Sequence, residues 1–370
     1  MISTEKIIAK LKSINGERSS LTKDECALIL SDNSKELREL LFKKAYEVKL
    51  NYVGNKVYFR GLIEYSNICI KDCYYCGVRK SNKSSKRYQL SDEEVLKAAE
   101  WALENRFGSI IIQAGERTDR QFVFKIEKLV KEIKRKSDGK LSITLSLGEQ
   151  TEEVYKRWFE AGAHRYLLRI ETSNPKLYKK LHPQNHSFDN RLRSLYSLKQ
   201  LGYQMGTGVM IGLPFQTTYD LVNDLYFFKE FDVDMIGMGP YLLHHDTPLA
   251  FEANEFKLDK DKQYFLSLKM IALSRIILGD VNIASTTALQ AIKPMGREYG
   301  LLAGANVIMP NITEQKYRSY YKLYEDKPCL NENYDDCRNC LEKRITMIGE
   351  KIGYDEWGDS IHFRKRIIVK

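Results

Sequence analysis

The chain has 370 residues, of which 43% are hydrophobic, and this length and composition allow a large buried core in a soluble globular protein. Neither a run of eighteen apolar residues nor a signal-peptide core occurs, so the sequence predicts a cytoplasmic protein without a membrane span. The net charge of +10 comes from 59 basic and 49 acidic residues, but the lysine-rich runs lack interleaved aromatic side chains, so we expect no nucleic-acid partner.

Residues 1–55 are predicted to form a helical N-terminal extension. Apolar side chains spaced for one helical face run from Ile7 to Ile14, and a second helical pattern covers 35–50. From residue 57 the pattern changes to short β-branched runs that alternate with amphipathic segments. The predicted strands are 57–64, 109–113, 142–146, 165–171, 205–211, 235–238, 282–286 and 305–309. The predicted helices are 91–105, 124–135, 152–161, 190–201, 218–231, 259–278 and 296–302.

Eight strands that alternate with helices predict an α/β fold, a (β/α)8 TIM-type barrel over residues 56–312. A doubly wound open sheet is the alternative, but no Gly-x-Gly-x-x-Gly follows an early strand. Residues 313–370 are predicted to form a C-terminal extension that packs on the barrel and carries an accessory cysteine triplet.

A first cysteine triplet, Cys69, Cys73 and Cys76, follows the first predicted strand, where barrel active sites are built. Three thiolates in one loop can hold a 4Fe–4S cluster and leave one iron without a protein ligand, so that a chelating substrate can bind there. Structural zinc is the alternative, but such sites close with four protein ligands, and no fourth Cys or His lies nearby in the sequence. The spacing therefore favours a cluster.

The fourth predicted strand carries charges on one side. Arg165, Arg169 and Glu171 alternate with apolar residues, and charges on the inward face of a barrel strand are costly unless they are paired or functional. We interpret them as functional groups of the cavity.

The motif Cys-x3-Cys-x-aromatic-Cys, with Tyr75 as its aromatic residue, resembles the signature of the radical S-adenosylmethionine (SAM) superfamily. The resemblance implies a 4Fe–4S cluster and SAM as cofactors, and reductive cleavage of SAM to a 5′-deoxyadenosyl radical. It also implies further SAM-binding residues, which are Gly115 and Glu116 in a turn similar to Gly-Gly-Glu, Glu171 for the ribose, Arg191 for the carboxylate, and Leu213 in a segment similar to Gly-x-Ile-x-Gly beside the adenine.

Several further blocks, among them 60–67, 142–149 and 304–311, resemble the HydE family of FeFe-hydrogenase maturases. Cys329, Cys337 and Cys340 have the spacing of the accessory cluster found in many members of that family. The resemblance implies a second iron–sulfur cluster, 2Fe–2S or 4Fe–4S. Read from the residues alone, this triplet is compatible with an iron–sulfur cluster, with zinc and an exogenous ligand, or with inert thiols.

The HydE resemblance implies that the adenosyl radical acts on the sulfur of an iron–cysteine–CO–cyanide precursor. It also implies that HydG supplies this precursor, the iron synthon, that HydF is the next maturase, and that a ferredoxin or flavodoxin is the electron donor. Thr144, Arg169, Thr287 and Met309 match HydE positions that line the cavity, although ordinary packing also explains the two threonines and the methionine. The alternative enzyme is an amino-acid radical mutase similar to methylornithine synthase. If the protein is not an enzyme, the alternative is a zinc-binding module.

Overall fold

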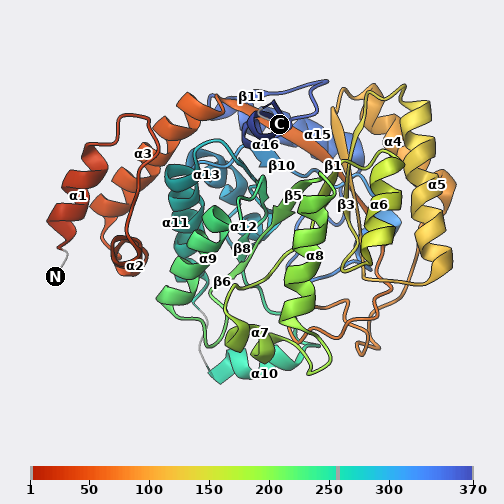
Figure 1. The fold of residues 1–370 in the computed structure, drawn as a ribbon, viewed down its shortest axis with the longest axis horizontal. Helices are drawn as coiled ribbons and strands as arrows, with labels where there is room; N and C mark the ends of the chain where they lie inside the picture. Colours follow the sequence, from red (N-terminus) through yellow and green to blue (C-terminus); the bar gives the residue numbers. More distant parts are fainter. Residues whose placement is uncertain (1–2, 256–258, 369–370) are drawn as a thin grey trace.

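Parallel strands form one curved sheet in the order β10-β1-β2-β3-β4-β5-β7-β9 in the computed structural model, which describes residues 3–255 and 259–368 (Figure 1). The two edges meet, because Ala284, just after β9, forms a parallel bridge with Val307 of β10. The N–H of Asn306 also donates to the carbonyl of Ile283 at 2.9 Å. The order therefore closes on itself, which confirms the predicted α/β barrel. The strands are β1 (Lys56–Ser66), β2 (Ser109–Ala114), β3 (Ser142–Ser146), β4 (Arg165–Leu167), β5 (Gln204–Thr207), β7 (Met235–Ile236), β9 (Asn282–Ile283) and β10 (Val307–Ile308).

Side chains alternate between the two faces of each strand. Ile110 and Ile143 face the helices and belong to the main hydrophobic core. Their neighbours Ile111, Thr144 and Arg165 pair in register across β2, β3 and β4 and point into the barrel. The first three strands were predicted within one or two residues, because their short β-branched runs stand out from the amphipathic helical segments.

The later strands are shorter than predicted. β4 ends at Leu167, and Glu171 has a φ of +66°, which is outside the range of a strand. The predicted strand 205–211 is divided into β5 and β6 (Met210–Ile211), and β6 pairs with β8 (Gly239–Pro240). After β5 and β7 the chain therefore pairs in a separate two-stranded sheet made of β6 and β8.

Helices surround the sheet and begin at defined caps. Ser91 and Glu94, for example, form a capping box at the start of α4. The helices after strands are α4 (Asp92–Glu104), α5 (Arg120–Lys136), α6 (Glu152–Glu160), α7 (Pro175–Leu181), α8 (Phe188–Gln200), α9 (Thr218–Glu230), α10 (Pro248–Glu255), α11 (Lys260–Leu278), α12 (Thr287–Ile292) and α13 (Gly296–Leu302). The short α7, α10 and α12 were not predicted, whereas α13, which is similarly short, was predicted with its observed bounds.

The N-terminal helices α1 (Thr4–Lys12), α2 (Lys23–Ser31) and α3 (Lys35–Tyr52) lie at one side of the barrel, where α3 packs on α11 (Figure 1). Lys49 of α3 is fully buried and forms an ion pair with Glu350 at 2.8 Å. It also donates to the carbonyl of Leu301 at 3.1 Å, so α3 is tied both to α13 and to the C-terminal segment.

The C-terminal segment contains α14 (Gln315–Arg318), α15 (Tyr334–Met347), β11 (Lys351–Ile352) and α16 (Ile361–Ile368), and it contacts both ends of the barrel. At the N-terminal ends of the strands, Asp359 forms an ion pair with buried Arg165 and accepts a hydrogen bond from Gln204 at 2.8 Å. At the opposite ends, Tyr324 lies 3.1 Å from the hydroxyl of Thr287. None of the helices in the described ranges has the length and apolar character needed to span a membrane.

Candidate active site

A cavity of about 340 Å³ lies at the C-terminal ends of the barrel strands. Its wall includes most of the residues that the sequence singled out, although they are spread over more than 250 positions. These are Cys69, Cys73, Tyr75, Cys76, Gly115, Glu116, Arg169, Glu171, Arg191, Thr287, Met309, Cys329 and Cys337. Closure of the barrel therefore brings the cysteine loop, the predicted SAM-binding residues and the predicted substrate residues to one space.

The cysteine loop after β1 is folded around the guanidinium of Arg87. This side chain donates to the carbonyls of Asn67 and Val78 at 2.7 and 2.8 Å, and to that of Arg79 at 2.5 Å. The side-chain amide of Asn82 donates to Gly77 at 2.7 Å. Arg87 lies in a lysine-rich run to which the sequence assigned no specific role, so this contact was not predicted.

The three thiols face the cavity and none of them forms a disulfide. Burial raises the pKa of Cys73 well above its usual value and that of Cys76 to about 12. Buried thiols with raised pKa values need a metal to hold them as thiolates, and three such donors in one loop suit a cluster. Cys69 already accepts the backbone N–H groups of Lys71 at 3.4 Å and Glu116 at 3.3 Å.

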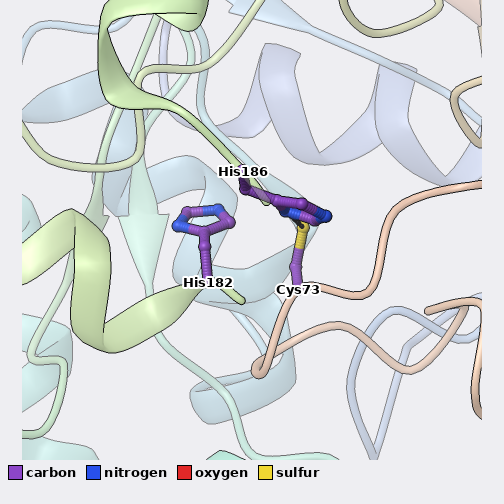
Figure 2. A group of neighbouring side chains, drawn as sticks. All are labelled: Cys73, His182 and His186. Carbon is purple, nitrogen blue, oxygen red and sulfur yellow. Dashed lines mark hydrogen bonds between the residues drawn. The ribbon is translucent and has the colours of Figure 1, made fainter. Parts of the chain in front are cut away.

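Two histidines lie beside Cys73 and bear on the zinc alternative. The potential ligand atoms of Cys73, His182 and His186 lie within 4.8 Å of one another (Figure 2). However, both ring nitrogens of His182 have partners, since Nδ1 lies 2.9 Å from the carbonyl of Tyr178 and Nε2 lies 3.3 Å from the hydroxyl of Tyr75. A zinc site here would displace one of these two contacts and leave Cys69 and Cys76 unused, so the arrangement favours the cluster.

Glycine is required at position 115. A Cβ atom there would lie 2.5 Å from the carbonyl oxygen of Ile68 and 2.7 Å from Cβ of Cys69. The turn after β2 is therefore packed directly on the cysteine loop, and its backbone borders the cavity. This close approach fits the predicted Gly-Gly-Glu-like turn.

A chain of alternating charges connects this turn to the predicted carboxylate-binding arginine. Arg191 Nε lies 2.6 Å from Glu149, whose other oxygen lies 3.0 Å from Lys71 Nζ. Lys71 Nζ in turn lies 3.3 Å from Glu116. Burial alone would raise the pKa of Glu149, but the charges of Arg191 and Lys71 hold it below its usual value. Burial also raises the pKa of Glu116, with the charge of Glu149 adding to the effect.

Lys71 and Glu149 were not singled out from the sequence. A signal was available for both, because Lys71 lies inside the cysteine motif and Glu149 follows β3 at the catalytic end of the barrel.

The charges of the fourth predicted strand have separate roles. Arg169 Nη2 lies 3.2 Å from Glu171 and donates to the carbonyl of Val209 at 2.8 Å. Arg169 Nε is buried and finds no hydrogen-bond partner among the described residues, whereas Glu171 Oε2 has the ion pair with Arg169 Nη2. An unsatisfied donor on the cavity wall is costly unless a ligand binds it. Arg165 is different, because its ion pair with Asp359 places it at the opposite end of the barrel.

The other predicted residues are divided between the cavity and its surroundings. Thr287 lines the cavity, and Met309 lines both this cavity and a small one of about 20 Å³ below it. Thr144 lines only the small cavity, where its buried hydroxyl has no hydrogen-bond partner in the described parts of the chain. Leu213 lines neither cavity, and it is buried in an apolar cluster that packs against Tyr75.

The second triplet is assembled only in part. The sulfur atoms of Cys329 and Cys337 lie within 4.8 Å of each other and of a carboxylate oxygen of Glu332. Arg297 Nη2 lies 3.9 Å from the sulfur of Cys329. Cys340, one helical turn after Cys337 on α15, is exposed and does not join this group.

Comparison with known proteins identifies the family. A model of the radical SAM superfamily matches residues 63–227. The [FeFe] hydrogenase maturase subunit HydE of Thermotoga maritima is 48% identical over 352 residues, which cover 95% of this chain and 96% of that protein. The chain belongs to the HydE family. It is a radical SAM enzyme, as the cysteine motif predicted.

Other relatives of this HydE-family chain are more distant. The 3-methylornithine synthase of Methanosarcina acetivorans is 28% identical, covering 79% of this chain and 80% of that protein. The biotin synthase of Geobacillus kaustophilus is 32% identical, covering 74% and 81%. The crystal structure of methylornithine synthase (PylB) superposes with a TM-score of 0.77 at 24% identity, covering 95% of this chain and 97% of that one. The X-ray structure of HydG from Carboxydothermus hydrogenoformans gives 0.79 at 22%, covering 98% and 81%. These two structures support the fold alone.

Proposed function

We propose that this enzyme acts in FeFe-hydrogenase maturation on an iron–cysteine–CO–cyanide precursor, supplied by HydG, and that the reaction begins at the sulfur of its cysteine. The product would pass to HydF. The observation that carries the proposal is the continuous cavity that runs from the cysteine loop to Arg169 and Thr287. Such a space lets a radical source and a polar substrate meet while surrounding protein limits access by water.

The first triplet would hold the 4Fe–4S cluster, and Glu116, Glu171 and Arg191 would hold SAM. The cluster and SAM, when bound, supply a 5′-deoxyadenosyl radical. Gly115 lets the backbone approach the cluster loop, while Tyr75 and Leu213 form the apolar side of the SAM site. A ferredoxin or flavodoxin would provide the electron.

The substrate end of the cavity would be formed by Arg169, Thr287 and Met309. Arg169 Nε is a buried donor that has no hydrogen-bond partner in residues 3–255 and 259–368, which suits a carboxylate or cyanide of the precursor. The hydroxyl of Thr287, which lies beside that of Tyr324, would offer the precursor a second polar contact after Arg169. Thr144 would act from the small cavity below, through Met309, which lines both spaces.

We also propose that Cys329, Cys337 and Cys340 hold an accessory metal centre of the 2Fe–2S or 4Fe–4S type. The two adjacent sulfur atoms of Cys329 and Cys337 support it, and exposed Cys340 would have to move to join them. Iron analysis of wild type against Cys337→Ser tests this proposal. Equal iron content in the two proteins would contradict it.

The deciding experiment for the main proposal is anaerobic incubation of the reconstituted enzyme with dithionite, SAM and a HydG-derived iron synthon. We expect an adenosylated sulfur product, detected by mass spectrometry, that depends on all three additions. Free cysteine in place of the synthon is the control. A parallel incubation replaces the synthon with lysine, an amino acid on which the alternative mutase could act. Rearrangement of lysine without any product from the synthon would overturn the proposal and favour the methylornithine-synthase-like mutase.

A further inference from the structure

The segment between α7 and α8 places an imidazole directly against one ligand of the predicted cluster. His186 is largely buried, and its Nδ1 lies 4.0 Å from the sulfur of Cys73, while the ring of His182 lies beside both (Figure 2). The backbone of His186 is fixed, because its N–H donates to the carbonyl of Pro183 at 2.9 Å. The ring is thus held beside the cysteine loop by structure outside that loop.

Hydrogen bonding at the far side of the ring selects the tautomer of His186. The backbone N–H of Asp72 points at Nε2 across 3.4 Å. A backbone N–H can only donate, so Nε2 must be the acceptor and the ring hydrogen lies on Nδ1. Nδ1 is the nitrogen that faces the Cys73 sulfur. The cysteine loop therefore both holds the ring and receives its hydrogen bond.

His182 is arranged differently and does not share this role. Its Nδ1 donates to the carbonyl of Tyr178, so its Nε2 is the acceptor for the Tyr75 hydroxyl. The Tyr75 hydroxyl also contacts Cys73, but its hydrogen is directed to His182. For the remaining ligands, Cys69 accepts backbone N–H groups from Lys71 and Glu116, and Cys76 accepts that of Val78. Cys73, by contrast, receives its hydrogen bond from an imidazole side chain, and a substitution of that side chain can remove the donor.

We infer that His186 is a positioning residue that donates an N–H···S hydrogen bond to Cys73 and thereby raises the reduction potential of the 4Fe–4S cluster. Reduction adds an electron to the cluster and its sulfur ligands, and a hydrogen bond to a ligand sulfur stabilises that added negative charge. The enzyme needs this reduced state to cleave SAM, so His186 makes the electron easier to accept from its donor. The inference rests on the proposed cluster site, and it is independent of the proposed substrate.

The test compares His186→Leu with His186→Asn, because the two side chains have almost the same branched shape. Asparagine can place an amide N–H near the position of Nδ1, whereas leucine offers no donor. Each reconstituted protein is titrated with a redox mediator series, and the reduced cluster is followed by EPR. At the potential where wild type is half reduced, we expect the reduced-to-oxidised ratio of the leucine variant to fall about tenfold, a shift of about 59 mV to more negative potential for one electron.

The asparagine variant should remain within about threefold of wild type, a shift of less than about 30 mV. Equal shifts in both variants, or no shift with leucine, would overturn the inference. If the leucine variant fails to bind iron, pulsed EPR of wild type grown with ¹⁵N-histidine decides the matter. A histidine nitrogen coupling to the reduced cluster supports the hydrogen bond, and its absence refutes it. Failure of the cluster assignment itself would be seen separately, as wild-type protein without iron at the first triplet or without a SAM-dependent change in its EPR signal.

Discussion

Substitution of Gly115 by alanine provides a direct test of how the turn after β2 supports the cysteine loop. The added Cβ would lie 2.5 Å from the Ile68 carbonyl oxygen, whereas ordinary van der Waals contact begins at 3.4 Å. Both close neighbours belong to the cysteine loop or its entry, so relief requires the backbone around Cys69 to move by nearly 1 Å. Such overpacking costs about 1–3 kcal/mol, and a displacement of about 1 Å at a reacting centre can lower a rate about 100-fold.

We therefore expect Gly115→Ala to lower the rate of 5′-deoxyadenosine formation by about 10- to 100-fold. The assay is chromatographic quantification of 5′-deoxyadenosine, with iron content and urea unfolding measured on the same preparations. Gly237→Ala is the matched control for iron content and stability, because its Cβ would meet only side-chain carbons of Leu167, at 3.6 and 3.7 Å. A Gly115→Ala protein with the wild-type rate and iron content would refute the reasoning that the turn and the loop are packed as one unit.

Three further changes have predictable effects. Asp359→Asn leaves the fully buried Arg165 without its carboxylate, so urea unfolding should show a loss of about 3–5 kcal/mol. Hydrogen bonding to Asp280 and to Asp232 raises the pKa of His362 in the folded protein. Protonated His362 therefore stabilises the docking of α16 fully at a pH below the pKa of histidine in the unfolded chain. This stabilisation is lost as the pH rises through the pKa of His362 in the folded protein. Hydrogen exchange in α16 should therefore be faster at pH 9 than at pH 6, after correction for intrinsic rates. Arg169→Gln should lower kcat/KM for the iron precursor about 10- to 100-fold, because it removes a charged hydrogen bond that contributes about 1.5–3 kcal/mol.

Each of these three expectations has a control and a contrary outcome. For the aspartate, Asp355→Asn removes an exposed ion pair with Arg106 and should change stability by less than about 1 kcal/mol. A similarly small change with Asp359→Asn would contradict the burial argument. For His362, the His362→Asn variant should lose the difference between the two pH values, and retention of that difference would exclude this histidine as its source. For Arg169, an unchanged kcat/KM would remove it from the proposed substrate site.

Much of the architecture could be predicted from local sequence. The first three strands are short segments of five to eleven residues rich in apolar side chains, and the early helices carry clear caps and periodicity. The triplet Cys69, Cys73 and Cys76 lies within eight consecutive residues, so its shared location follows from chain connectivity alone. The family resemblance added Glu116 and Arg191, which the barrel does bring to the same cavity.

Other features depend on the closed barrel, because they join residues far apart in the sequence. Glu149 meets Lys71 across 78 positions, and His186 meets Cys73 across 113. The partner of Arg165 is Asp359, 194 positions away, so an inward charge that seemed functional proves to be held by the C-terminal segment. A sequence pattern records which face a residue occupies, but the position along the barrel axis and the partner opposite are set only when strands and extensions pack together.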